Sequence, residues 1–196
     1  MAISKETIIA ASIKILNRDG VEYLSMRTLA KELDIKAASL YWHIKSKQEL
    51  YGEIAEFICL QYTLPNNIGD AKSYIGESCK AYRAMLLTVR DSVTIFQESH
   101  PNTPRRMELI RSQTEAISKM KIKKGFISTA ANIINNFVLS FVADELRIKN
   151  TSPEQLTELA EKLSLEEKFD FDNIGNFDEN FEYGLEVIFT GLENVE

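Results

Sequence analysis

Residues 24–50, LSMRTLAKELDIKAASLYWHIKSKQEL, constrain the fold of this chain more than any other segment. In the first part, four apolar residues recur at the spacing of one helical face, with charged residues on the opposite side. These apolar residues are Leu24, Leu29, Ala30 and Leu33. Asp34 and Ile35 follow where a turn is needed, and a second short helix begins after them. The segment therefore predicts two short helices joined by a tight turn.

The second of these helices is too small to bury much surface by itself, and it is rich in small and hydrogen-bonding side chains. The side chains that suit a contact surface are Ala37, Ala38, Ser39, Tyr41 and His43. They alternate with Leu40, Trp42 and Ile44, and we interpret Trp42 as a core residue. Lysines flank the helix on both sides. This composition fits the recognition helix of a helix-turn-helix element, which lies in the major groove of DNA.

Two strings in this segment, RTLA at residues 27–30 and LYWHIKSK at residues 40–47, resemble the DNA-binding domain of the TetR family of repressors, and the tetracycline repressors within it. Near the other end of the chain, FEYGLEVI at residues 181–188 and GLE at residues 191–193 resemble their C-terminal helix. Order and spacing agree along most of the chain. The resemblance implies an all-α fold with a helix-turn-helix head and a larger helical body that binds a ligand and dimerises.

The resemblance also implies which residues of the head contact double-stranded operator DNA. Arg27, Tyr41, His43 and Lys47 match operator-contacting residues of the family, and Ser39 stands where the family has a threonine. The departure is at the start of the recognition helix, where alanines replace a Gln-Pro pair. Alanine can touch a thymine methyl group but cannot hydrogen-bond a base edge, so the operator should differ from the tetracycline operator. The predicted DNA-binding set is Arg27, Lys36, Ala37, Ala38, Ser39, Tyr41, His43 and Lys47.

Two observations on the head leave alternatives open. His43 can contact DNA, or its ring can pack inside the head. The charge is also uneven: residues 1–50 carry 8 basic and 6 acidic residues, a net of +2, whereas the remainder carries 15 and 23, a net of -8. A mildly basic head on an acidic body would orient the protein on DNA. Ordinary scatter in composition explains a net of +2 equally well.

The rest of the chain is predicted to be helical, because only 8 Gly and 4 Pro interrupt it. Ser4 is expected to cap a first helix that ends between Asn17 and Gly20. The predicted domains are a head at 1–48, a connecting helix at about 47–63, and a ligand-binding and dimerisation body at 64–196. Further helices are predicted at 71–88, 91–99, 104–118, 124–148, from Pro153 onward, and 177–194. The stretch 168–180 is predicted to be mostly loop.

The last helix is predicted to form the homodimer interface. Gly184 and Gly191 lie seven residues apart on one face, and a glycine costs about 1 kcal/mol in a helix interior, so close helix approach is expected. The alternative is packing against the 124–148 helix of the same chain. The predicted interface residues are Phe181, Gly184, Leu185, Ile188, Gly191 and Leu192. The family implies a four-helix bundle that places two heads on a palindromic operator, with half-sites about 34 Å apart.

The body departs from the family at the drug site. In the tetracycline repressors a histidine coordinates a magnesium ion held by the drug, and Phe96 stands at that position here. Thr63 and Ser78 stand near two other polar drug contacts and are shorter. We therefore expect no metal, no cofactor and no magnesium–tetracycline, but an apolar or aromatic effector. The predicted ligand residues are Tyr82, Leu86, Phe96, Ser99, His100, Phe137 and Phe141. The alternative is that these side chains are part of the core, because aromatic residues on helices are more often core than ligand contacts.

The resemblance implies a mechanism as well. Ligand bound near residues 96–101 would shift the short helix that ends there. That helix would push the 47–63 helix and move the two heads apart. Proline disfavours continued helix at the preceding residue, so the break at His100 and Pro101 suits this role.

Other function classes find little support in the sequence. There is no Gly-rich phosphate loop, no metal-ligand spacing and no Gly-x-Ser-x-Gly elbow, so we expect no enzyme. The absence of an apolar run of about 20 residues predicts no membrane span, and we place the protein in the cytoplasm. Cys59 and Cys79 are expected to be reduced and buried, with a redox role as the alternative. A scaffold or small-molecule-binding protein that has lost DNA recognition is the rival hypothesis. Effector, operator sequence, target genes and repression versus activation are left open.

Overall fold

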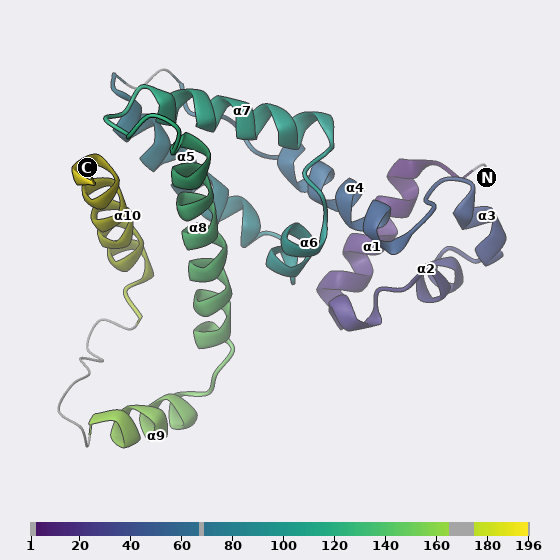
Figure 1. The fold of residues 1–196 in the computed structure, drawn as a ribbon. Helices are drawn as coiled ribbons and strands as arrows, with labels where there is room; N and C mark the ends of the chain where they lie inside the picture. Colours follow the sequence, from purple (N-terminus) through teal and green to yellow (C-terminus); the bar gives the residue numbers. More distant parts are fainter. Residues whose placement is uncertain (1–2, 67–68, 165–174, 196) are drawn as a thin grey trace. The chain divides into compact units, whose positions relative to one another are not determined.

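The computed structural model describes residues 3–66, 69–164 and 175–195, which contain ten α-helices, one short 3-10 helix and no strand (Figure 1). The first helices along the chain are α1 (Lys5–Asp19), η1 (Val21–Tyr23), α2 (Met26–Glu32), α3 (Ala37–Tyr41) and α4 (Lys47–Leu60). The later ones are α5 (Ala71–Leu86), α6 (Ser92–Glu98), α7 (Pro104–Ser118), α8 (Ile127–Lys149), α9 (Pro153–Ser164) and α10 (Phe177–Asn194). The predicted all-α fold is confirmed.

Most predicted helix limits agree with the observed ones to within about three residues. The largest difference in the head concerns the recognition helix, which ends at Tyr41 instead of continuing to Ile44. The loop predicted at 168–180 extends too far, because α10 already begins at Phe177. Residues 165–174 of that stretch lie outside the described residues.

Contacts within the chain define two compact units. Unit 1 combines residues 1–66 with residues 80–113, and unit 2 combines residues 67–79 with residues 114–196. The boundary predicted at residue 64 divides a DNA-binding part from a ligand-binding part, whereas these units are defined by contacts. The functional division therefore stays a prediction. Each unit has its own buried core, and the two are described separately.

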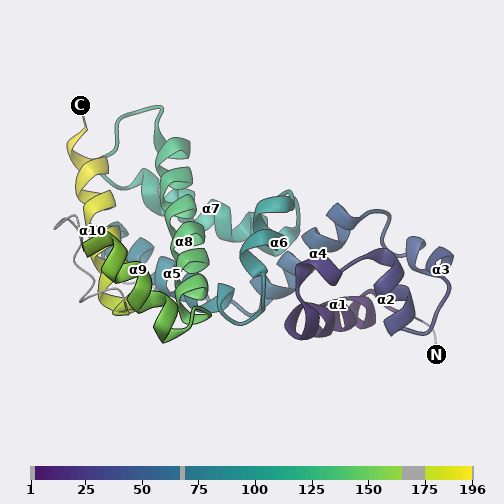
Figure 2. The same cartoon turned by 90° about the horizontal axis from the view of Figure 1, so that it is seen from below.

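The core of unit 1 is formed by the inner faces of α1, α2, α3 and α4, which are grouped together in both views (Figures 1 and 2). Its most deeply buried aliphatic residues are Ile8, Ile15, Leu16, Leu24, Leu29, Leu40, Ile44, Leu50 and Ile54. Burying each such side chain contributes about 1.5–3 kcal/mol relative to leaving it exposed. Ser12 shares this core because its hydroxyl donates to the Ile8 carbonyl at 2.8 Å. Helix α6 packs against α4 in the same unit.

The core of unit 2 includes the contact between α8 and α10, which run side by side (Figure 1). Phe181, at 0% exposure, packs against the rings of both Phe137 and Phe141, at centroid distances of 5.4 and 5.0 Å. Gly184 is the position of closest approach: a Cβ atom built there would lie 2.5 Å from the ring of Phe137. The absence of a side chain at Gly184 therefore admits the Phe137 ring.

Replacing Gly184 with Ala should destabilise the protein. The added methyl group would displace the Phe137 ring, which is already held by two other aromatic rings, and such overpacking costs about 1–3 kcal/mol. The matched control is Gly76→Ala in α5, where a Cβ atom meets nothing within 4 Å. The control should be unchanged or more stable by up to about 1 kcal/mol. Urea unfolding measures both variants, and equal effects would contradict the packing account.

Candidate nucleic-acid interface and effector segment

Serine side chains begin three of the helices in the head. Ser4, Ser25 and Ser46 occupy the N-cap positions of α1, α2 and α4, and each accepts a hydrogen bond from the N–H three residues later. Such a cap satisfies one of the unpaired donors at a helix N-terminus and contributes about 1 kcal/mol. Glu49 adds a return contact, because its carboxylate accepts from the Lys45 N–H at 2.7 Å. The prediction for Ser4 is confirmed, and the two other caps fix where α2 and α4 begin.

The turn between α2 and α3 depends on a left-handed residue. Asp34 has φ of 53°, and its N–H donates to the carbonyl of Lys31. The next N–H, that of Ile35, donates to the carbonyl of Ala30 at 3.0 Å. Paired bonds of this kind close a helix end, usually with glycine at the left-handed position, and aspartate is one of the few other residues that tolerate it. The predicted turn at Asp34 and Ile35 is therefore present.

Helix α3 is held to the head by its apolar side. Leu40, which lies on α3, and Ile44, which follows the helix, are both fully buried. The Ile44 N–H also donates to the Leu40 carbonyl at 3.0 Å, so the chain keeps a helical turn beyond the last residue of α3. This arrangement leaves the other side of the helix open to solvent.

All of the predicted DNA-binding residues are exposed. They are Arg27 on α2, Lys36, Ala37, Ala38, Ser39 and Tyr41 at or on α3, His43 after it, and Lys47 at the start of α4. Lys47 also lies over the ring of Tyr51, 5.1 Å from its centroid. The neighbouring Tyr51 raises the pKa of Lys47 above its usual value. The head therefore presents cationic, aromatic and hydroxyl side chains on the surface around α3.

Trp42 corrects the sequence interpretation. It was expected in the core, but its side chain is 87% exposed. The physical reason is that Leu40 and Ile44, four residues apart, share the inner face of this turn, whereas Trp42 lies two residues from each and therefore faces away from the core. His43 is exposed as well, which removes the alternative that its ring packs inside the head. Alternation of apolar and polar residues did not separate these cases, because Trp42 and Leu40 have the same spacing in that pattern.

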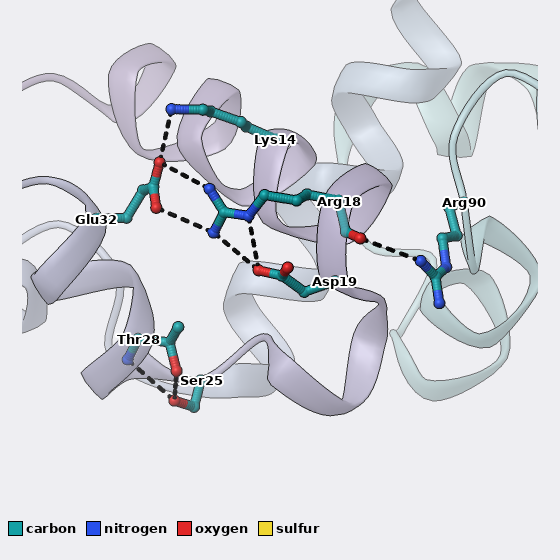
Figure 3. Close-up of polar contacts among 7 residues, drawn as sticks. All are labelled: Lys14, Arg18, Asp19, Ser25, Thr28, Glu32 and Arg90. Atoms are coloured by element: carbon teal, nitrogen blue, oxygen red, sulfur yellow. Dashed lines mark hydrogen bonds and ion pairs between the residues drawn. The ribbon is translucent and has the colours of Figure 1, made fainter.

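A group of ion pairs connects α1 and α2 (Figure 3). Glu32 on α2 accepts from Lys14 at 2.7 Å and from Arg18 at 3.2 Å, both on α1. These two bonds lower the pKa of Glu32. Arg18 also pairs with Asp19 at 2.8 Å. Exposed ion pairs contribute little stability individually, but a connected set restrains the angle between two helices that carry a binding surface.

Several of the predicted ligand residues form a second cluster around Phe96 on α6. Phe96 is buried and meets the ring of Tyr82 edge-on at 5.8 Å. Leu86 and Ser99 are also buried, whereas His100 is exposed. Four of the predicted ligand residues of unit 1 are thus buried or half-buried, and the fifth is on the surface. Their role as ligand contacts stays a prediction.

Arg106 on α7 is the member of this cluster that sequence analysis missed. Its guanidinium lies over the Phe96 ring, 4.7 Å from the centroid, and donates to the Phe96 carbonyl at 2.8 Å. It also donates to the Ser99 hydroxyl at 2.7 Å. Burial lowers the pKa of Arg106. A cation at the C-terminal end of a helix is favourable, because the last carbonyls carry partial negative charge. Nothing in the spacing of Arg105 and Arg106 distinguished the inward residue from its neighbour.

Glu56 on α4 completes the connection between α4 and α7. Its two carboxylate oxygens accept from the backbone N–H groups of Arg105 and Arg106, at 2.8 and 3.1 Å. Partial burial raises the pKa of Glu56, but the hydrogen bonds from these two N–H groups oppose it, and the pKa is lowered overall. Arg105 returns a bond to the Tyr62 carbonyl at 2.8 Å. The helix that connects to the head is therefore bonded to the first turn of α7.

The remaining predicted residues lie in unit 2. Phe137 and Phe141, which were expected to contact ligand, pack on Phe181. Phe181 and Leu185, which were expected at the dimer interface, are enclosed within their own protomer. Gly184 likewise follows the alternative that was left open, packing against α8. The surroundings of Gly191 are open, and Ile188 and Leu192 are half-buried. These three stay predicted interface residues.

The two cysteines are free and buried. Burial raises the pKa of both thiols to about 12, so they are protonated at neutral pH. Among the residues that the structure describes, no group of three or more His, Cys, Asp or Glu side chains is arranged to hold a metal ion. Within the same residues, no helix is both long and apolar enough to cross a membrane.

A helix-turn-helix whose first helix is capped by Ser25 and whose second helix exposes cationic, aromatic and hydroxyl side chains is typical of a DNA-binding regulator. Comparison with known proteins agrees. The profile described as "Bacterial regulatory proteins, tetR family" matches residues 8–54, and "Tetracyclin repressor-like, C-terminal domain" matches residues 65–195. The chain belongs to the tetR family, whose members are ligand-responsive transcriptional regulators.

Individual relatives cover nearly the whole chain. The class C tetracycline repressor of Escherichia coli is 28% identical over 98% of this chain and 92% of its own. A structure of ActR from Streptomyces coelicolor in complex with actinorhodin has a TM-score of 0.83 at 23% identity, covering 98% and 97% of the two chains. BioQ with its natural double-stranded DNA operator has a TM-score of 0.75 at 26% identity, covering 98% and 99%.

Glu56→Gln should make the protein less stable near pH 7 by about 1 kcal/mol, because two backbone N–H donors lose a charged acceptor that is partly screened by solvent. The folded-state pKa of Glu56 is lowered, so its contribution is full above the unfolded value near 4.5 and is lost as the pH falls through the folded value. The difference between wild type and variant should therefore shrink below about pH 4.5.

Urea unfolding at a series of pH values measures this difference. The control is Glu115→Gln on the exposed surface of α7, where the carboxylate pairs only with Lys119 among the contacts described, at 3.1 Å. The control should differ little from wild type at any pH. A Glu56 variant with a constant difference across the series would contradict the assigned role.

Proposed function

We propose that this protein is a transcriptional repressor that binds a palindromic operator as a homodimer and is released by a small apolar or aromatic molecule. The observation that carries the proposal is the placement of α3. Leu40 and Ile44 anchor it, and every predicted DNA-contact residue is exposed around it. BioQ, which has this fold and 26% identity over nearly the whole chain, was solved on its operator, which supports the same use of the head here.

The exposed side chains divide into two kinds of DNA contact. Arg27 and Lys36 suit direct readout, because a guanidinium or ammonium group can donate to O6 and N7 of guanine. Tyr41, Ser39 and Lys47 suit the phosphate backbone, which fixes register without reading sequence. Ala37 and Ala38 offer methyl groups to thymine. We also assign the exposed Trp42 to this interface as an addition to the predicted set.

The homodimer is supported by apolar residues left exposed on the two long helices of unit 2. Ile133 on α8 is 44% exposed, and Tyr183 and Val187 on α10 are 73% and 53% exposed. A second copy of the same helices would cover these exposed apolar residues and could approach closely at the open Gly191. A two-fold dimer matches a palindromic operator, since each head then meets one half-site.

The effector proposal rests on Phe96. A phenylalanine cannot coordinate magnesium, and its ring is already part of an aromatic and cationic cluster with Tyr82 and Arg106. Such a cluster suits an aromatic effector better than a drug held through a metal ion. ActR, which shares this fold, holds actinorhodin in one of its structures. At 23% identity that likeness supports the fold alone and does not name the effector of this chain.

We propose that the effector acts by shifting α6. Helix α6 ends at Glu98, just before the His100–Pro101 break, and it packs against α4 in unit 1. Movement of α4 would change the separation of the two heads. An effector that binds the DNA-free form about 100-fold more tightly shifts the equilibrium by about 2.7 kcal/mol. Structures with and without effector that have the same head separation would contradict this mechanism.

A second candidate function is a ligand-binding or scaffold protein that no longer recognises an operator. The observation that favours it is the pair of exposed alanines, Ala37 and Ala38, at the start of α3. The exposed Arg27, Tyr41 and Lys47 favour the regulator. As a DNA-binding regulator the protein would act in the cytoplasm, and we assign it no catalytic step.

The regulator proposal is tested by fluorescence anisotropy with DNA fragments from around the gene of this protein. We expect saturable binding to one palindromic fragment. Arg27→Ala should lose about 1–3 kcal/mol of binding free energy and relax specificity at one base pair, and adding Tyr41→Ala should abolish specific binding. Lys47→Ala should weaken binding to all sequences and lower the salt slope by about one. Glu115→Ala serves as a distant control.

If every fragment binds weakly and without sequence preference, selection from random DNA decides between the two candidates. A recovered palindrome would keep the regulator and place its operator elsewhere. Recovery of no sequence would favour the scaffold.

Trp42 gives an independent test, because it is the single tryptophan of the chain and is 87% exposed. Binding of the palindromic operator should change the fluorescence intensity of Trp42 or shift its emission maximum. Scrambled DNA of the same length and charge should leave the emission nearly unchanged at concentrations where only the palindrome binds. An unchanged spectrum at saturating operator would remove Trp42 from the interface and leave the other contacts in place.

A further inference from the structure

The turn between α5 and α6 is bonded to the C-terminal end of α1, and both belong to unit 1. The backbone N–H of Arg90 donates to the side-chain oxygen of Asn17 at 3.0 Å. The Arg90 guanidinium donates to the Arg18 carbonyl at 3.3 Å, as Figure 3 shows. The Asp91 carboxylate accepts from the Val21 N–H at 2.7 Å. Three hydrogen bonds thus connect two segments that lie about 70 residues apart in the sequence.

The conformation of Asp91 directs its side chain to the head. Asp91 is the N-cap residue of α6, yet its side chain makes no capping bond to that helix. Its backbone is left-handed, with φ of 59°, which is uncommon for a residue other than glycine. The carboxylate instead accepts from the first residue of η1. Aspartate is a common N-cap residue, but the Asp91 side chain bonds to η1 and makes no capping bond to α6.

On the other side of this junction, Gly20 leaves room for the Arg90–Asp91 turn. It lies between α1 and η1 with φ of 96°. A Cβ atom built on it would lie 3.0 Å from the Arg90 guanidinium and 3.2 Å from the Asp91 carboxylate. The missing side chain therefore lets the Arg90–Asp91 turn approach the end of α1. The bonded segment leads through η1 directly to Ser25, the cap of α2, and α2 carries Arg27.

We propose that Asp91 is a positioning residue for DNA binding, which fixes the α1–α2 side of the head to the N-terminal end of α6. At the other end of α6, Arg106 holds the carbonyl of Phe96. The N-terminal end of α6 is thus hydrogen-bonded directly to the head through Asp91, in addition to the packing of α6 on α4. The inference rests on the proposed operator binding. Its consequence is that the head keeps one orientation, so that a dimer discriminates between operators with different half-site separations.

The experiment uses the palindromic operator identified under the proposed function and measures binding to three versions of it. One keeps the natural separation between the half-sites, and the other two lengthen or shorten it by one base pair. Asp91→Gly removes the carboxylate and keeps the left-handed backbone available, whereas Asp91→Asn keeps an acceptor of the same shape. Asn17→Ala removes a contact on the other side of the junction. Glu115→Ala, which removes one exposed carboxylate elsewhere, is the control. Circular dichroism and thermal unfolding establish that each variant is folded at the temperature of the assay.

Wild type and the control should prefer the natural separation. Asp91→Gly should reduce that preference by at least about fivefold, Asn17→Ala should reduce it in the same direction, and Asp91→Asn should largely restore it. A residue that only stabilises the fold would lower the unfolding temperature and leave the preference unchanged, which would overturn the inference. If Asp91→Gly does not fold, Asn17→Ala decides alone. Failure of wild type to bind any palindrome would instead contradict the proposed function, and the inference with it.

Discussion

The burial of Leu40 and Ile44 is the interaction on which the function of this structure depends. Helix α3 has five residues, far fewer than a helix needs to be stable in water by itself. It persists because these two aliphatic side chains enter the core formed by α1, α2 and α4. The same anchoring decides which side chains face outward, since the inner positions are filled. The DNA-facing surface is thus a consequence of how the core is packed.

In unit 1, charged side chains connect the ends of helices to neighbouring segments. Glu56 accepts from the first N–H groups of α7, Arg106 donates to the last carbonyls of α6, and Asp91 accepts from the first N–H of η1. Each of these contacts uses unpaired backbone groups at a helix end, which need partners wherever they are not solvated. A side chain that satisfies such a group also fixes the position of that helix end. The segment around α6 is therefore bonded at both of its ends.

Much of this architecture could be predicted from the sequence. Helical periodicity and few glycines gave the helices and most of their limits, and Ser4 was recognised as a cap because it directly precedes an apolar-periodic segment. The DNA-contact set rested on the resemblance of RTLA and LYWHIKSK to one family, which specified positions that periodicity leaves undetermined. Trp42 was missed because alternation of apolar residues does not follow helical spacing. In a helical turn Leu40 and Ile44 share one face, and Trp42, two residues from each, faces solvent.

Local order is what the sequence by itself determined: which segments are helical, where Ser4 begins the first of them, where a turn is needed at Asp34 and Ile35, and which short helix is too small to bury much surface by itself. These features depend on neighbours within a few residues, so they can be derived from spacing. The tertiary structure alone decided that Phe181 packs on Phe137 inside one protomer, and that Arg106 faces inward while Arg105 pairs with Glu108. It also decided that Asp91 bonds to Val21. Phe137 and Val21 lie far in the chain from their partners, and Arg105 and Arg106 are adjacent side chains of equal chemistry. Only the packed arrangement of helices selects one.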